Sequence, residues 1–329
     1  MRQARQIHTE GQGGIMERKH EKYERLIARC KALSPVPTAV AHPCDETSLR
    51  GAVEAAEMGI LLPILVGPRD KIEAVAAQFK LDISPYQLVD VPHSHAAAEM
   101  AVQLAREGKA EMLMKGSLHT DELMAAVVRS ATGLRTGRRI SHAFIMDVPK
   151  LDRVIIVTDA AINIFPTLTD KMHIIQNAID LVTDLDFPNP KVAILSAMET
   201  VNPDVPSTVE AAALCKMADR KQITGGILDG PLALDNAIDL SAAAIKKIDS
   251  PVAGKADILV VPDLEAGNML AKSLSFMADA DAAGIVLGAR VPIILTSRAD
   301  SVMTRLASCA VAALVAQARR ASAGKAVAS

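Results

Sequence analysis

The sequence predicts an α/β fold built on mainly parallel sheet. Short apolar runs alternate with longer amphipathic segments along most of the chain, and parallel strands require such crossover segments between them. Many of the apolar runs end in Gly, Asp, Pro or Ser, for example at Gly67-Pro68 and at Asp229-Gly230. In parallel α/β sheets the ligand site lies at the carboxyl ends of the strands, so functional residues are expected at these endings.

Eleven segments are expected to be strands and nine to be helices. The strands are predicted at residues 38–41, 63–66, 87–91, 111–114, 143–147, 153–158, 191–195, 226–228, 257–261, 284–287 and 292–295. The helices are predicted at residues 16–34, 47–59, 69–79, 94–107, 169–182, 207–220, 236–248, 265–277 and 301–317, with a frayed tail after Arg320. One open sheet could hold all the strands, but two sheets fit the chain length better.

Composition favours a large folded protein and excludes several functions. The length of 329 residues suits one large domain or two of about 150 residues. The chain is 50% hydrophobic and 22% charged, and its net charge of −2 argues against general nucleic-acid binding. Aromatic residues make up only 2%, too few for base-stacking surfaces. The four widely spaced cysteines indicate a reducing compartment, without a disulfide framework or a zinc site. With no apolar run of about 18 residues and no signal peptide, a cytoplasmic protein is expected, with residues 1–15 as a tail or linker.

Three segments combine strand endings with chemically useful side chains. In the first, a strand ends at Lys115 and is followed by Gly116 and Ser117; backbone N–H groups at such a turn, with a nearby cation, are typical of an anion site. In the second, acids and an amide follow strands at Asp229, Asp263 and Asn268. Each segment also reads as an ordinary turn with a helix cap.

The third segment follows the last predicted strand and holds Ser297, Arg298 and Asp300. Arginine is suited to bidentate recognition of phosphate, and a serine hydroxyl can donate a hydrogen bond to a carbonyl or phosphoryl oxygen. Asp300 is either a base or, like Ser301, a cap for the following helix. A basic cluster of Arg135, Arg138 and Arg139 precedes another strand; it is either a solvated charge run or a site for an anionic substrate.

Several common catalytic motifs are absent from the sequence. There is no G-x-x-x-x-G-K-[ST], no G-x-G-x-x-G after a strand, no G-x-S-x-G and no H-E-x-x-H. A P-loop ATPase or kinase, a classical dinucleotide-binding enzyme and an α/β-hydrolase are therefore disfavoured. No metal site is expected.

Six motifs, in order, resemble the phosphate acetyltransferase and phosphate butyryltransferase family over residues 20–318. They are HPCDE (His42–Glu46), MKGSLHT (Met114–Thr120), TDAAIN (Thr158–Asn163), LDGPLALDNAI (Leu228–Ile238), ADILVVPDLEAGNMLAKSL (Ala256–Leu274) and LTSRADS (Leu295–Ser301). The likeness is greatest to the transferase portion of bifunctional enoyl-CoA hydratase/phosphate acetyltransferase proteins.

The resemblance implies a two-domain fold like that of the isocitrate and isopropylmalate dehydrogenases, with mainly parallel sheets and substrate in an interdomain cleft. Domain I would comprise residues 16–148 and 288–329, and domain II residues 149–287. A homodimer is implied. The implied reaction moves an acetyl or butyryl group between coenzyme A and inorganic phosphate, by direct attack of the thiol on the acyl phosphate in a ternary complex. It requires no cofactor, since coenzyme A is a substrate.

The resemblance also assigns residues. Ser297 and Arg298 match the family's Ser-Arg pair, with Arg298 holding the phosphoryl group and Ser297 near the reacting carbonyl. Many acetyltransferases have a functional Asp seven residues after that Ser, but this chain has Thr304 there, so Asp300 is the nearest candidate base. A carboxylate near pKa 3.9 would take a proton from a thiol near 8.5 against about 6 kcal/mol, so Asp300 needs a raised pKa or transfer concerted with attack.

Lys115, Gly116, Ser117, Arg135, Arg139, Asp229, Asp263 and Asn268 are the expected substrate-binding residues. The family's Arg-Pro after the His-Thr pair is replaced here by Met124-Ala125-Ala126, and the arginine cluster is the expected substitute for that cation. Two alternatives stay open: a metal- and NAD-dependent β-decarboxylating dehydrogenase of the same fold, and a non-catalytic domain that binds acyl-CoA.

Overall fold

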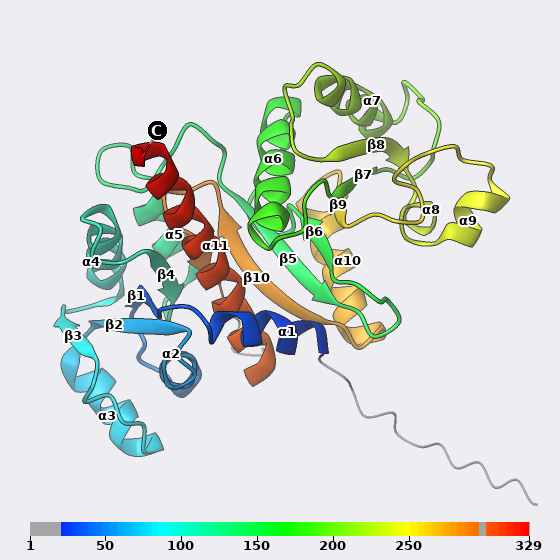
Figure 1. Cartoon of the computed structure of the whole chain (residues 1–329). Coiled ribbons are helices and arrows are strands. Elements are labelled where there is room, and N and C mark those ends of the chain that lie inside the picture. The colour runs from blue at the N-terminus through cyan, green and yellow to red at the C-terminus, as the bar shows by residue number, and fades with distance from the viewer. Residues whose placement is uncertain (1–20, 296–300, 329) are drawn as a thin grey trace, which may run out of the picture.

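The structure is a computed structural model that describes residues 21–295 and 301–328, with side chains to residue 322 in the last helix. All eleven predicted strands are present in it, and they form one sheet (Figure 1). In spatial order the strands are β3 (Gln87–Asp90), β2 (Leu61–Gly67), β1 (Val36–Ala41), β4 (Met112–Lys115), β11 (Ile293–Ile294), β10 (Asp281–Leu287), β5 (Ser141–Asp147), β6 (Ile155–Thr158), β9 (Ile258–Val260), β7 (Lys191–Leu195) and β8 (Ile227–Leu232).

Two long central strands make the sheet continuous. β5 and β10 pair antiparallel over their whole length, from Asp281 opposite Asp147 to Leu287 opposite Ser141. β10 also pairs antiparallel with β11, and β5 with β6; the remaining pairs are parallel. The preference for two sheets was therefore wrong, because these two strands hydrogen-bond both halves together.

The helices also follow the prediction, with three differences. They are α1 (Glu21–Cys30), α2 (Glu46–Glu57), α3 (Arg69–Phe79), α4 (Ser94–Arg106), α5 (Thr120–Val128), α6 (Leu168–Asp184), α7 (Pro206–Asp219), α8 (Leu234–Ile238), α9 (Leu240–Ile245), α10 (Leu264–Met277) and α11 (Val302–Ala328). The helix expected at 236–248 is split, because Asp239 caps α9 by accepting a hydrogen bond from the Ala242 backbone at 2.9 Å. α5 begins at Thr120, where a helix start was expected after the Lys115 turn, although no range was predicted for that helix.

The third difference is that α11 continues to Ala328, beyond Arg320, where a frayed tail was expected. The segment is rich in alanine, which has the highest helix propensity. The expected tail at residues 1–15 lies outside the described residues, and α1 falls within the helix expected at 16–34.

The apolar core is continuous on one face of the sheet. Side chains alternate between the two faces along each strand. On the face covered by α1, α2, α6, α7 and α11, one cluster runs from β1 and β2 through β10 and β5 to β7 and β9; it includes Ala143, Ile145, Ala283 and Ile285 of the central strands. Figure 1 shows α11 crossing the middle of the sheet on this side.

On the opposite face the core is divided in two. One cluster lies under α4 and α5 and ends at Val286 of β10 and Ile293 of β11. The other lies under α8, α9 and α10 and begins at Phe144 and Met146 of β5. The break between the two clusters falls over the central strands, where Gly284 contributes no side chain.

α1 is fastened to the central strands through Tyr23. Its hydroxyl donates to the backbone carbonyls of Ile145 and Asp281 and accepts from the Ala283 backbone at 2.8 Å. Burial raises the pKa of Tyr23 well above its ordinary value. On the same face of the sheet, α1 also lies side by side with α11 (Figure 1).

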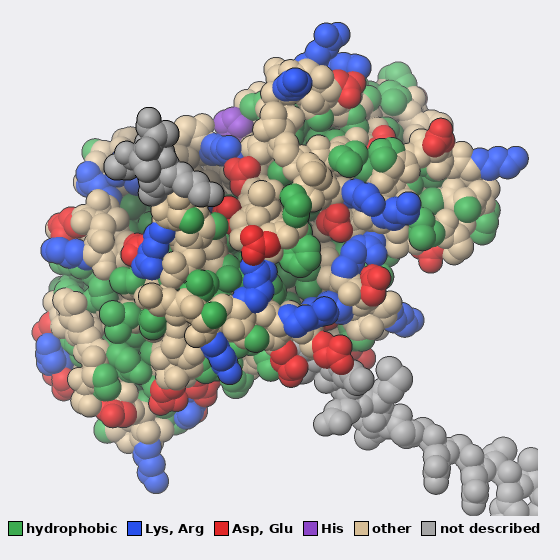
Figure 2. All heavy atoms as spheres, in the orientation of Figure 1, with side chains coloured by type: hydrophobic (Ala, Val, Ile, Leu, Met, Phe, Trp, Pro, Cys, Tyr) green, Lys and Arg blue, Asp and Glu red, His purple; other side chains and the backbone are tan. Residues whose placement is uncertain are grey.

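The visible surface mixes both signs of charge. Figure 2 shows Lys and Arg side chains interspersed with Asp and Glu over this face, as expected for a net charge of −2. In the part of the chain that the structure describes, no helix has the length and hydropathy needed to cross a membrane.

Candidate active site

The loop after β4 is held against the loop after β1. The backbone N–H of Gly116 donates to Ala41 at 2.9 Å, and that of Ser117 donates to His42 at 2.8 Å. A Cβ on Gly116 would lie 2.6 Å from the carbonyl carbon of His42 and closer still to two backbone oxygens. Only glycine fits this approach, and the two amides expected to form an anion site instead serve the chain itself.

The side chains of the same loop strengthen this junction. Ser117 Oγ donates to the His42 carbonyl at 2.8 Å and lies 2.9 Å from His42 Nδ1. Lys115 Nζ donates to the carbonyls of Gly116 and Leu118 at 3.1 and 3.2 Å. Burial lowers the pKa of His42, and Lys71 lowers it further. The HPCDE and MKGSLHT motifs are thus neighbours in space.

A second loop, after β6, is organised by a buried carboxylate. Asp159 accepts hydrogen bonds from the backbone N–H groups of Ala161 and Ile162, both at 3.0 Å, and from Asn163. Asn163 Oδ1 in turn accepts from Arg139 Nε at 2.7 Å. The TDAAIN motif therefore fixes the position of the Arg139 guanidinium through Asn163.

The start of α10 packs against this second loop. Asp263 caps the helix by accepting from the Ala266 backbone at 2.8 Å. Asn268 Nδ2 donates to the Ala160 carbonyl at 3.4 Å, and a Cβ on Gly267 would lie 2.9 Å from the Asp159 carbonyl oxygen. The structure thereby brings Asn268 and Arg139 to the same loop.

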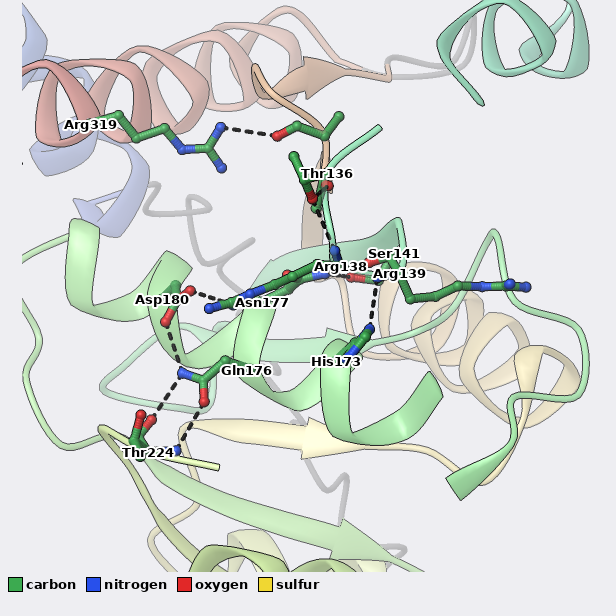
Figure 3. A network of polar contacts seen from close by, with 12 residues as sticks. Thr136, Arg138, Arg139, Ser141, His173, Gln176, Asn177, Asp180, Thr224 and Arg319 are labelled. Carbon is green, nitrogen blue, oxygen red and sulfur yellow. Dashed lines mark hydrogen bonds and ion pairs between the residues drawn. The ribbon is translucent and has the colours of Figure 1, made fainter. Parts of the chain in front are cut away.

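The arginine cluster does not act as one patch. Arg138 Nη1 pairs with Asp180 at 2.6 Å, whereas Arg139 points the opposite way (Figure 3). Both backbone groups of Arg139 are anchored on α6: its N–H donates to His173 Nδ1, and its carbonyl accepts from Asn177, each at 2.9 Å. Arg135 is exposed and forms a β-bridge with Ala289.

Asp229 lies apart from these two loops. It belongs to β8, the edge strand farthest from β3, and its Oδ1 accepts from the Gly230 backbone at 2.8 Å. The sheet therefore does not bring Asp229 close to Lys115 on β4, because the carboxyl ends of strands meet only when those strands are near neighbours.

The predicted catalytic residues Ser297, Arg298 and Asp300 lie outside the described residues. On one side of them, Leu295 follows β11, which pairs with β4 and β10. On the other, Ser301 Oγ accepts from the Thr304 backbone at 3.1 Å, so Ser301 caps α11. Thr304 is buried, and its Oγ1 donates to Asp281 Oδ1 at 3.3 Å.

Sequence reasoning overlooked His142, Asp159 and Asn163 as site residues. All three are buried beside the loop after β6. Asp159 and Asn163 belong to the TDAAIN motif, so their spacing was a usable signal. His142 lies inside a strand among apolar residues, where nothing in the sequence marks it.

We expect Asn163→Ala to lower the free energy of unfolding by about 2–3 kcal/mol, because the buried Asp159 carboxylate loses a donor and Arg139 loses an acceptor. The KM for phosphate should rise as well if Arg139 binds an anion. Urea denaturation and initial rates measure the two effects. For the free energy of unfolding, Asn268→Ala is the matched control, because it removes only a long hydrogen bond; an equal loss of stability in both variants would contradict the role given to Asn163.

A cavity of about 350 Å³ lies between the turn before β5, α6 and α11. Its lining includes Arg138, Asp184 and Arg319. Arg319 Nη1 donates to the carbonyls of Ala289 and Arg290 at 3.3 and 3.1 Å. Burial raises the pKa of Asp184 to about 6, with Arg319 acting in the opposite direction.

The raised pKa of Asp184 predicts a pH effect on stability. Between its unfolded value and about 6 the folded protein binds more protons than the unfolded chain, so this contribution is lost as pH rises through 6. Asp184→Asn should therefore be more stable than the unchanged protein above pH 7 by roughly 1–2 kcal/mol, after allowing for partial exposure. Thermal denaturation from pH 5 to 8 measures the gap, and a gap that does not widen with pH would disprove the assignment.

Comparisons with known proteins give the family. A sequence profile described as "Phosphate acetyl/butaryl transferase" matches residues 93–313. The chain is 69% identical to the phosphate acetyltransferase of Rhizobium meliloti over 300 residues, covering 91% of this chain and 95% of that protein. It is 40% identical to the phosphate butyryltransferase of Clostridium acetobutylicum over 296 residues, covering 90% and 98%.

Solved structures agree on the fold. A branched-chain phosphotransacylase from Enterococcus faecalis V583 superimposes with a TM-score of 0.75 at 29% identity, covering 85% of this chain and 99% of that one. A 4-hydroxythreonine-4-phosphate dehydrogenase from Klebsiella pneumoniae, at 13% identity and a TM-score of 0.54 over 86% and 100% of the chains, shares the fold alone. This confirms the predicted dehydrogenase-like α/β fold. With the profile match and the identities to curated relatives, the chain belongs to the phosphate acetyltransferase and phosphate butyryltransferase family.

Proposed function

We propose that this protein is an acyltransferase that moves an acetyl or butyryl group between coenzyme A and inorganic phosphate. The observation that carries the proposal is the 69% identity, over almost the whole of both chains, to a phosphate acetyltransferase. An acyl phosphate is already activated, so the site has to orient two anionic substrates, stabilise charge on the carbonyl and the departing phosphate, and accept the thiol proton.

Arg298, Ser297 and Asp300 are the proposed catalytic residues. The coenzyme A thiol attacks the acyl phosphate carbonyl directly, Arg298 holds the phosphoryl group, and Ser297 donates a hydrogen bond near the reacting carbonyl. Asp300 accepts the thiol proton. The capping contact made by Ser301 supports that role, since the alternative role for Asp300 was to cap the same helix.

Two groups of residues are proposed to bind the substrates. Lys115, Gly116 and Ser117 form the loop after β4, and Arg139 and Asn268 lie at the loop after β6, with Asp263 capping α10 beside it. The anchoring of Arg139 by Asn163 supports its use, because a fixed guanidinium loses less freedom on binding an anion. Arg135 and Asp229 remain proposals from the sequence.

The division into domain I (16–148 and 288–329) and domain II (149–287) is also proposed, with substrate bound between them. On one face of the sheet the apolar core divides over β10 and β5, the two strands that end at the proposed boundaries. We further propose a homodimer with no cofactor besides its substrate coenzyme A and no nucleic-acid or membrane partner. The four free cysteines support a cytoplasmic location.

Phosphate- or arsenate-dependent cleavage of acetyl-CoA and butyryl-CoA tests the function. The buffer contains EDTA and no nucleotide, which separates this activity from a metal- and NAD-dependent dehydrogenase. We expect cleavage of at least one thioester, and the ratio of the two rates then identifies the preferred acyl group. Binding of acyl-CoA without turnover would replace the proposal with a regulatory binding domain.

A further inference from the structure

His142 lies at the break in the apolar core. It is on β5, and its register partner Val286 on β10 belongs to the cluster under α4 and α5. The next residue on the same face of β5, Phe144, packs on the cluster under α10. His142 therefore stands between the two halves of the core, on the same face as Gly284.

The imidazole of His142 is buried without the hydrogen bonds that a buried histidine normally makes. The residue is 2% exposed. Its Nδ1 is sealed from solvent and has no hydrogen-bond partner, and within residues 21–295 and 301–328 no hydrogen bond to Nε2 is found either. Its ring packs edge-on against Phe144, with the centroids 4.4 Å apart. A buried polar atom left unpaired costs about 1–3 kcal/mol, and such an atom in a native fold calls for an explanation such as catalysis.

Gly284 leaves room for the Nε2 edge of the ring. A Cβ on Gly284 would lie 3.0 Å from His142 Nε2 and 3.1 Å from the Leu295 carbonyl oxygen. Nε2 thus lies over a bare stretch of β10, close to the end of β11. Leu295 is the last described residue before the segment that carries Ser297 and Arg298 in the sequence.

Burial favours the neutral form of the His142 imidazole. Burial lowers its pKa to about 4, although the Asp159 carboxylate acts in the opposite direction. Both Asp159 oxygens accept hydrogen bonds from the 161–163 loop. A neutral imidazole carries one N–H. When the proton is on Nε2, the one N–H of the ring lies at the break in the apolar core. The sealed Nδ1 then carries no proton that would need an acceptor.

We propose that His142 donates a hydrogen bond from Nε2 to the carbonyl oxygen of the acyl substrate. This inference rests on the proposed acyl transfer. In that reaction the C–S bond forms, the C–O bond to phosphate breaks, and phosphate leaves with the electron pair while the thiol proton passes to the base. The carbonyl oxygen becomes negative in between. A neutral donor stabilises that oxygen while neither gaining nor losing a proton itself.

A matched pair of variants tests the proposal. The amide nitrogen of glutamine reaches the Nε2 position of histidine, whereas that of asparagine reaches only the Nδ1 position. We expect His142→Asn to lower kcat about 100- to 1,000-fold, the usual effect of removing one such donor, and His142→Gln to stay within about tenfold of the unchanged protein. The KM for coenzyme A should change little in both. Equal kcat values in the two variants would overturn the proposal.

Replacing a buried residue such as His142 risks a protein that does not fold. A second measurement therefore uses the unchanged protein. ¹⁵N NMR of histidine-labelled protein, with the His142 signal assigned from its loss in either variant that folds, reports the tautomer. We expect the neutral Nε2–H form at pH 7 and a shift of that signal when acetyl phosphate is added. A charged ring, an Nδ1–H tautomer or an unmoved signal contradicts the proposal. Failure of the proposed function can be told apart from failure of the His142 proposal, because the unchanged protein would then show no acyl transfer.

Discussion

Replacing Gly116 with alanine is expected to destabilise the protein by about 3 kcal/mol and to remove most of its activity. The added Cβ would meet backbone atoms of Ala41 and His42 rather than a side chain that can rotate away. Overpacking of this kind costs typically 1–3 kcal/mol, and more where backbone must move. The two loops would have to separate, which breaks the hydrogen bonds from Gly116 and Ser117.

Gly137→Ala is the matched control for this variant. A Cβ there meets nothing within 4 Å, and Gly137 has an ordinary φ, so we expect a change within about 0.5 kcal/mol. Urea denaturation gives both free energies of unfolding, and initial rates give the activity. If Gly116→Ala is as stable as Gly137→Ala, the loops after β1 and β4 are not in contact, and the arrangement described for Lys115 and Ser117 is wrong.

Replacing Arg298 with alanine is expected to lower kcat/KM for phosphate by about 1,000-fold without changing the thermal midpoint. The reason is the loss of the charge-assisted, bidentate contact that we propose between Arg298 and the phosphoryl group in the transition state. Arg298→Lys should recover only part of the rate, because lysine keeps the charge but not the planar fork.

Arg69→Ala serves as the control for a lost surface arginine, since Arg69 is exposed on α3 and pairs with Glu73. It should retain full activity. If Arg298→Ala changes only the KM for coenzyme A, then Arg298 binds coenzyme A and not phosphate. Full activity in Arg298→Ala would remove it from the mechanism altogether.

The local parts of the fold could be predicted from the sequence, and the pairing of the strands could not. Apolar runs bounded by Gly, Pro and Asp identified every strand, because that signal is contained within a few residues. The single sheet depends on β5 and β10 pairing across more than a hundred residues of chain. No feature of either strand alone reveals its partner.

In the candidate site too, local features could be predicted from the sequence and spatial neighbours could not. Lys115, Gly116 and Ser117 were identified because they end a strand. The structure places them where the loop after β4 is hydrogen-bonded to the loop after β1. Asp229 also ends a predicted strand, but that strand lies at the far edge of the sheet. His142 went unnoticed because its interest comes from what surrounds it, namely a break in the core and missing hydrogen bonds, and neither is visible in the sequence.

The most direct measurement follows the reaction of acetyl phosphate with coenzyme A in the presence of the purified protein. The buffer contains EDTA and neither nucleotide nor added metal. Phosphorus NMR counts the phosphate released, and absorbance counts the thioester formed. Acyl transfer predicts one thioester for each phosphate released, with no free acetate. Phosphate release without thioester, or a reaction that needs metal or nucleotide, would contradict the proposed function.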